Sequence, residues 1–166
     1  MNTDIENATT AATARRNTRI AFVSSAGGVL PDVVTLADNW PVSIDEFWIA
    51  PRAADTEATL ARRRVTWIDE PGDTPGSIMK ASTQARSTLS REKIDWVVSA
   101  GTAIALPFFL AAKSVGVSTL WVETLNMHGG QGRVAEVCSR LATRTLVQSS
   151  ERLTAHRRAI FMGELQ

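Results

Sequence analysis

The sequence has few of the residues that build disulfides, metal sites or membrane spans. Cys138 is the single cysteine, which excludes an internal disulfide and suits a reducing compartment. His128 and His156 are the two histidines and lie far apart, so we expect no metal site. The longest apolar run, residues 103–112, contains Pro107 and is shorter than the roughly 18 residues of a membrane span. The N-terminus lacks the apolar core of a secretory signal, so we expect a cytoplasmic protein. We also expect that the protein uses no cofactor.

The sequence also lacks a large excess of charge of either sign. The 18 Lys and Arg residues nearly balance the 17 Asp and Glu residues, for a net charge of +1. No strong field therefore draws the chain to nucleic acid. Residues 1–18 are rich in Thr, Ala and Asn without periodicity, and we interpret them as a disordered tail. Its arginines allow at most a weak, peripheral contact with a membrane.

The most informative stretch that is present runs from Arg19 to Leu30. Residues 20–23 form a short apolar run typical of a buried strand, and residues 24–28 are all small. Apolar residues then recur at helical spacing from Leu30 onward. A strand thus leads through a glycine turn into a helix, whose start presents free N–H groups to an anion or a polar sugar. Gly27 and Gly28 allow a ligand to approach the backbone closely, although an ordinary turn has the same pattern.

Strand and helix patterns alternate along the rest of the chain. We expect further strands at residues 46–50, 65–68, 94–99, 118–123, 143–148 and 159–162. We expect helices at residues 56–64, 77–93, 103–115, 132–141 and 149–157, with Met79 among the inward-facing residues of the second of these. This alternation predicts an α/β protein, a Rossmann-like three-layer parallel sheet with right-handed crossovers. Residues 19–166 form its single domain.

Three loops are expected to meet in one cleft, because ligands of such sheets bind beyond the carboxyl ends of the strands. They are residues 24–28, residues 100–102 and residues 123–131. The candidate binding residues there are Ser25, Gly27, Gly28, Gly101, Thr102 and Arg133, and the candidate catalytic residues are Glu123 and His128. A guanidinium matches phosphate oxygens, and a threonine hydroxyl either binds a ligand or caps the following helix. A solvated surface role remains the alternative for Arg133 and for His128.

The ordered motifs of these loops resemble a known family. Ser24-Ser-Ala-Gly-Gly-Val-Leu30, Ser99-Ala-Gly-Thr-Ala-Ile-Ala-Leu-Pro-Phe108, Trp121-Val-Glu-Thr124 and Leu141-Ala-Thr-Arg-Thr-Leu-Val-Gln148 stand in the family's order. The family comprises the acceptor-side, membrane-associated subunits of two-component UDP-N-acetylglucosaminyltransferases of dolichol-linked oligosaccharide, capsule and exopolysaccharide synthesis. The same motifs are more distantly similar to the N-terminal half of the transferase that forms lipid II.

The resemblance implies one half of a split GT-B glycosyltransferase. This half would bind a sugar or lipid-linked acceptor at the inner face of the membrane, and a separate partner subunit would hold the UDP-sugar. The sugar, N-acetylglucosamine in the family, would pass to an acceptor hydroxyl only when both subunits are present.

One departure from the family bears on catalysis. The family's glycine-loop histidine is Val29 here, and valine can neither take nor orient a proton. Glu123 could serve as the base instead, or His128 could enter the vacated space. Two alternatives stay open: a non-catalytic docking or regulatory subunit, and a stand-alone UDP-sugar enzyme, such as an epimerase, on the same fold.

Overall fold

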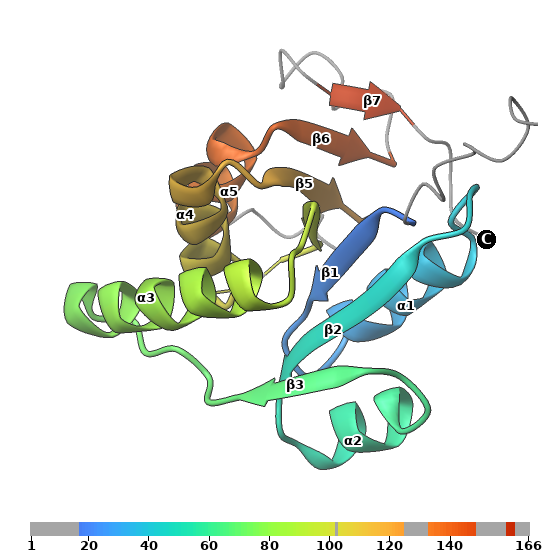
Figure 1. Cartoon of the computed structure of the whole chain (residues 1–166), viewed down its shortest axis with the longest axis horizontal. Coiled ribbons are helices and arrows are strands. Elements are labelled where there is room, and N and C mark those ends of the chain that lie inside the picture. Colours follow the sequence, from blue (N-terminus) through green and yellow to red (C-terminus); the bar gives the residue numbers. More distant parts are fainter. Residues whose placement is uncertain (1–16, 102, 125–132, 149–158, 162–166) are drawn as a thin grey trace, which may run out of the picture.

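The computed structural model describes residues 17–101, 103–124, 133–148 and 159–161. Its strands are β1 (Arg19–Val23), β2 (Asp45–Pro51), β3 (Val65–Ile68), β4 (Trp96–Ser99), β5 (Ser118–Glu123), β6 (Arg144–Val147) and β7 (Ala159–Phe161). Its helices are α1 (Val29–Asp38), α2 (Ala54–Leu60), α3 (Pro75–Arg91), α4 (Ala105–Val115) and α5 (Arg133–Leu141). Figure 1 shows how these elements are arranged.

The described strands form one parallel sheet in the order β3-β2-β1-β4-β5-β6-β7. From β1 the chain moves outward through β2 to β3, and α3 then carries it back to β4 on the other side of β1. From β4 it moves outward in the opposite direction. The order therefore reverses between β1 and β4, where α/β sheets of this kind bind their ligands.

Helices cover the sheet on both faces and make it a three-layer fold (Figure 1). On one face, α3, α4 and α5 pack against alternate residues of β1, β2, β4 and β5; buried among them are Ala21, Ile49, Val97, Trp121, Leu89, Phe109 and Cys138. On the other face, α1 and α2 pack against the intervening residues; buried among them are Phe22, Trp48, Val98, Val122, Leu30, Val33 and Leu60. Side chains of a strand point alternately to opposite faces, so short apolar runs supply both cores.

Local sequence explains where the longest helix begins. The Oγ1 of Thr74 accepts a hydrogen bond from the N–H of Ser77 at 3.2 Å, which satisfies a free donor of the first turn. Pro75 follows at the first helical position, where its missing N–H costs nothing. On this helix Ala85 and Leu89 are buried four residues apart. Met79 is 70% exposed, so the expectation that it faces inward is wrong.

The predicted α/β class and Rossmann-like parallel sheet are confirmed. The strands predicted at residues 65–68 and 118–123 have the observed bounds, and most of the other described elements begin and end within about two residues of the expected positions. The exception is α2, which ends at Leu60 rather than at the expected residue 64. The helix expected at residues 149–157 and most of the tail, residues 1–16, lie outside the described residues. None of the helices described is both long enough and apolar enough to cross a membrane.

Candidate functional site

The carboxyl ends of β1, β4, β5 and β6 lie side by side along one edge of the sheet. Ser99 pairs with Trp121, and Gly101 and Glu123 each follow two residues later. Glu123 in turn pairs with Val147. The described parts of the three loops predicted to converge therefore do meet at one edge. Buried polar residues gather along it: Ser24, Ser25, Ser99, Glu123, Thr124 and Gln148.

The turn between β1 and α1 is built around Gly27. Its φ of 92° lies in the left-handed region that side chains disfavour, so glycine is needed there. The next residue, Gly28, already has helical angles and precedes the first turn of α1. A Cβ at either glycine would contact nothing within 4 Å, so the turn has open space on its outer side.

A carboxylate already occupies one donor of this turn. The N–H of Gly27 donates to the Oδ2 of Asp55 at 2.8 Å. Asp55 lies in the first turn of α2, where its Oδ1 accepts from the N–H of Thr56 at 2.9 Å. The buried hydroxyl of Thr56 holds this turn by donating to the carbonyl of Pro51 at 2.7 Å. An anion at Gly27 would therefore stand next to a fixed negative charge.

Asp55 was not among the residues expected from sequence. It follows β2 rather than one of the three loops, and it is 28 positions from Gly27 along the chain. The only sequence signal is an acidic residue just after a predicted strand, which many surface turns share. Its contact with the glycine turn follows from the pairing of β1 with β2, which sequence periodicity does not specify.

A buried hydrogen bond joins the ends of β1 and β4. The Oγ of Ser99 donates to the carbonyl of Val23 at 2.7 Å. Gly101 follows with a φ of 142°, a second position that favours glycine. The buried serine thus fixes the point where the strand order reverses. Thr102 lies outside the described residues.

Glu123 is the last residue of β5, and Thr124 follows it directly; both are buried. Side-chain alternation directs Glu123 to the same face as Trp121, toward the layer of α4 and α5. Thr124 is also buried, and its Oγ1 has no hydrogen-bond partner among the described residues. A buried hydroxyl without a partner is costly, so a ligand hydroxyl at this edge would satisfy it.

Two predicted site residues, Arg133 and His128, remain, together with Val29 at the position of the departure from the motif. Arg133 is exposed at the first position of α5 and makes no ion pair with any described residue. Val29 begins α1 and packs against the core on the α1 side, so an apolar contact stands where the resembling motif has a histidine. His128 lies outside the described residues, so its possible entry into the site stays a prediction.

The described edge can bind and orient a polar ligand. It offers hydroxyls at Ser25 and Thr124, a buried carboxylate at Glu123 and an exposed one at Asp55. Carboxylates accept hydrogen bonds from hydroxyls and can take a proton from one. Among the described residues no group of three or more His, Cys, Asp or Glu side chains could hold a metal ion.

No protein-family model matches this sequence, and no curated protein is similar to it. Solved structures do resemble it. MurG of Acinetobacter baumannii superposes with a TM-score of 0.68 at 19% identity, over 89% of this chain and 44% of that one. UDP-N-acetylglucosamine 2-epimerase of Rickettsia bellii superposes with a TM-score of 0.69 at 14% identity, over 90% and 46%. A glycosyltransferase of Rickettsia africae gives 0.65 at 12% identity, over 89% and 43%.

These similarities establish the fold. The chain spans less than half the length of each of these structures, and it has the Rossmann-like architecture of one half of a GT-B protein. The neighbours include both glycosyltransferases and epimerases, and identities of this size carry no activity across.

Proposed function

We propose that this chain is the acceptor-binding half of a two-component glycosyltransferase. A separate partner subunit would hold a UDP-sugar, and the sugar would pass to a hydroxyl of an acceptor bound at the carboxyl edge. The observation that carries the proposal is the combination of a GT-B half fold with a polar edge at the reversal of strand order. The chain spans 44% of MurG, which is the extent of one half of such a fold.

In the proposed reaction Glu123 acts as the base. Its carboxylate takes the proton of the acceptor hydroxyl while the hydroxyl oxygen attacks the anomeric carbon of the sugar. The bond from that carbon to UDP breaks, and UDP leaves on the partner subunit. Closing the two halves around both substrates excludes water and orients the attack, which supplies much of the rate.

The glycine turn favours a neutral group of the acceptor. Because Asp55 occupies the N–H of Gly27, a phosphate there would be repelled, whereas a sugar hydroxyl could donate to the same carboxylate. A lipid diphosphate on the acceptor would then lie toward Thr102 and Arg133 instead. The geometry of Asp55 thus favours a carbohydrate hydroxyl at Gly27.

Two other functions are each favoured by one observation. Val29 packs against the core where the resembled family has a histidine that could accept a proton. The loss of that group is what a non-catalytic docking subunit would show. The epimerases among the structural neighbours favour a stand-alone UDP-sugar enzyme. If the chain is a docking subunit, replacing Glu123 should leave the activity of the partner unchanged. If it is a stand-alone enzyme, this chain alone should bind a UDP-sugar tightly.

The test is reconstitution. The chain and the candidate UDP-sugar-binding polypeptide would be purified apart, and sugar transfer measured with each alone and with both together. We expect transfer only from the mixture and no tight binding of a UDP-sugar to this chain by calorimetry. Transfer or epimerisation by the isolated chain would overturn the two-component proposal.

A further inference from the structure

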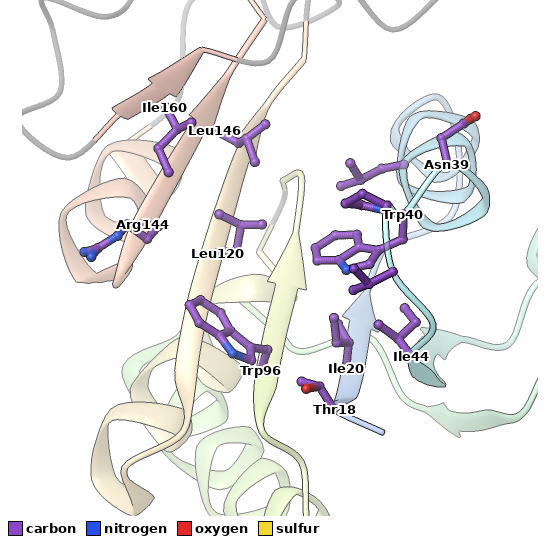
Figure 2. Close-up of a pocket in the computed structure, with 13 residues that line it drawn as sticks. Thr18, Ile20, Asn39, Trp40, Ile44, Trp96, Leu120, Arg144, Leu146 and Ile160 are labelled. Atoms are coloured by element: carbon purple, nitrogen blue, oxygen red, sulfur yellow. The ribbon is translucent and has the colours of Figure 1, made fainter. Parts of the chain in front are cut away.

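The α1 side of the sheet changes character along the strands. Over their amino-terminal part lies an apolar groove of about 410 Å³, between the end of α1 and the strands β4, β5 and β6. Figure 2 shows side chains of these strands pointing into the groove opposite the ring of Trp40. Most of the lining is apolar: Ile20, Leu36, Trp40, Pro41, Val42, Ile44, Trp96, Leu120, Leu146 and Ile160. A polar ligand would find little to bind in this part of the face.

The groove is open because no described helix covers β4, β5 and β6 on the side of α1. Right-handed crossovers from β4 to β5 and from β5 to β6 carry α4 and α5 to the opposite face of the sheet. On the groove side, α1 and α2 belong to the connections between β1, β2 and β3. Among the described residues, the carboxyl ends of β5 and β6 are therefore also free of a covering helix on this side.

Two polar residues at these carboxyl ends face the same side as the groove. Leu120 and Leu146 point into the groove in Figure 2, and successive side chains of a strand alternate between the two faces. Thr124 is four residues beyond Leu120, and Gln148 is two residues beyond Leu146. Alternation therefore directs Thr124 and Gln148 to the α1 side, whereas it directs Glu123 to the layer of α4 and α5.

Thr124 and Gln148 also lie next to each other. Glu123 pairs with Val147 in the parallel register of β5 and β6, so the residues that follow them are neighbours about 5 Å apart. Thr124 is 5% exposed and Gln148 is 6% exposed. The Oγ1 of Thr124 has no hydrogen-bond partner among the described residues. The amide of Gln148 has two N–H donors and a carbonyl acceptor, so it can bind a ligand while it keeps a contact within the protein.

We propose that Thr124 and Gln148 form a subsite for a neutral carbohydrate on the α1 side of the polar edge. A sugar hydroxyl both donates and accepts hydrogen bonds, which suits a hydroxyl that lies beside an amide. The turn at Gly27 leads into α1 on this same side, two strand spacings or about 10 Å from the end of β5. Asp55 disfavours an anion at that turn, so both polar places on this side select an uncharged ligand.

The two faces of the edge then have different roles. Thr124 and Gln148 hold the carbohydrate from the α1 side, and the carboxylate of Glu123 lies on the side of α4 and α5. That this carbohydrate is the acceptor of the transfer rests on the proposed function. In that reaction Thr124 and Gln148 set the affinity for the acceptor, whereas Glu123 sets the rate of proton removal.

The first measurement compares the stability of two valine variants by thermal denaturation. Thr119→Val and Thr124→Val each remove a buried hydroxyl and keep the shape of the side chain. The Oγ1 of Thr119 accepts a hydrogen bond from the N–H of Thr143 at 3.0 Å, so Thr119→Val should lower the melting temperature. Thr124→Val should leave it unchanged or raise it, because no described group loses a partner. An equal fall in both variants would overturn the subsite, since the Thr124 hydroxyl would then serve the fold.

The second measurement is an NMR titration of the full chain with N-acetylglucosamine, a neutral sugar with several hydroxyls and an amide. We expect the sugar to shift the amide signals of Thr124 and Gln148. Thr124→Val should bind it about three- to tenfold more weakly, which is the contribution of one hydrogen bond. Thr119→Val is the matched control and should bind as the wild type does. A wild type that does not bind the sugar, or a Thr124→Val variant that binds it equally well, would overturn the subsite.

Sugar transfer by the mixture of both subunits separates this inference from the proposed function. With the partner present, Thr124→Val should raise the KM for the acceptor and leave kcat nearly unchanged. Sugar binding that Thr124→Val weakens, without transfer by any mixture, supports the subsite and overturns the transferase. Transfer with an unchanged acceptor KM in Thr124→Val overturns the subsite alone.

Discussion

The two faces of the sheet are built from the same strands, yet the helices that the structure describes cover the two faces unequally. Beneath α3, α4 and α5 the large side chain of Trp121 is fully buried. Its ring packs edge to face against that of Phe109, with the two ring centroids 6.0 Å apart. On the other face Trp96 remains half-buried in the groove beside α1. The difference teaches that the same strands can be fully covered on one face while, among the described residues, part of the other face stays apolar and partly exposed.

Truncating one tryptophan on each face gives the largest expected effect. Trp121→Ala should lower the free energy of unfolding by about 3–5 kcal/mol, since it opens a cavity in a closed core. Trp96→Ala should cost the isolated chain only about 1–2 kcal/mol, since its side chain is only partly buried. Urea denaturation checks both values. Equal losses would break the comparison between the faces.

Glu123 sharpens the comparison because it lies two residues beyond Trp121 on the same strand. Glu123→Ala should lower the turnover of the proposed two-subunit complex at least about tenfold, since the acceptor hydroxyl would lose its proposed base. The KM for the acceptor should change much less. Glu136→Ala on the exposed surface of α5 is the control and should leave turnover unchanged. Unchanged turnover in Glu123→Ala would remove this residue from the mechanism.

Two adjacent glycines provide a smaller test at the edge where the faces meet. Gly27→Ala should destabilise the protein by about 1–2 kcal/mol, because its φ of 92° strains any side chain. Gly28→Ala should stay within about 1 kcal/mol of the wild type, because its angles are helical. Both positions have open space, so the pair separates backbone strain from crowding. Thermal denaturation would reveal the difference, and similar losses at both would contradict it.

The smallest expected effect concerns ligand choice at the glycine turn. Asp55→Ala should tighten the binding of inorganic phosphate at Gly27 about fivefold, since it frees an N–H and removes a nearby charge. An NMR titration that follows the Gly27 amide would measure it. Glu57→Gln removes a charge from the same turn of α2, where Glu57 pairs with Arg52 at 3.5 Å, and should change nothing. Wild-type protein that binds phosphate as tightly as Asp55→Ala would refute the selectivity.

The sequence predicted the elements well and their contacts less well. Apolar runs located β5 and β3 to the residue, because buried parallel strands leave a strong local pattern. The contact between Gly27 and Asp55 could not be predicted, because pairing between distant segments leaves no local sequence pattern. The prediction that Met79 faces inward was wrong, because the apolar spacing fits several rotations of α3 about its axis and only packing selects among them. The groove has the same origin, since it arises from handedness and strand order rather than from any one segment.

The buried thiol of Cys138 makes the chain convenient for site-directed probes. It packs in the core beneath α5, and burial raises its pKa to about 12. At neutral pH that thiol is shielded and protonated, so maleimide reagents should ignore it. A cysteine placed at Val42 or Met79 could then carry a fluorophore or spin label in an otherwise unmodified molecule. Distances from the two faces to a bound subunit would become measurable without first removing a native residue.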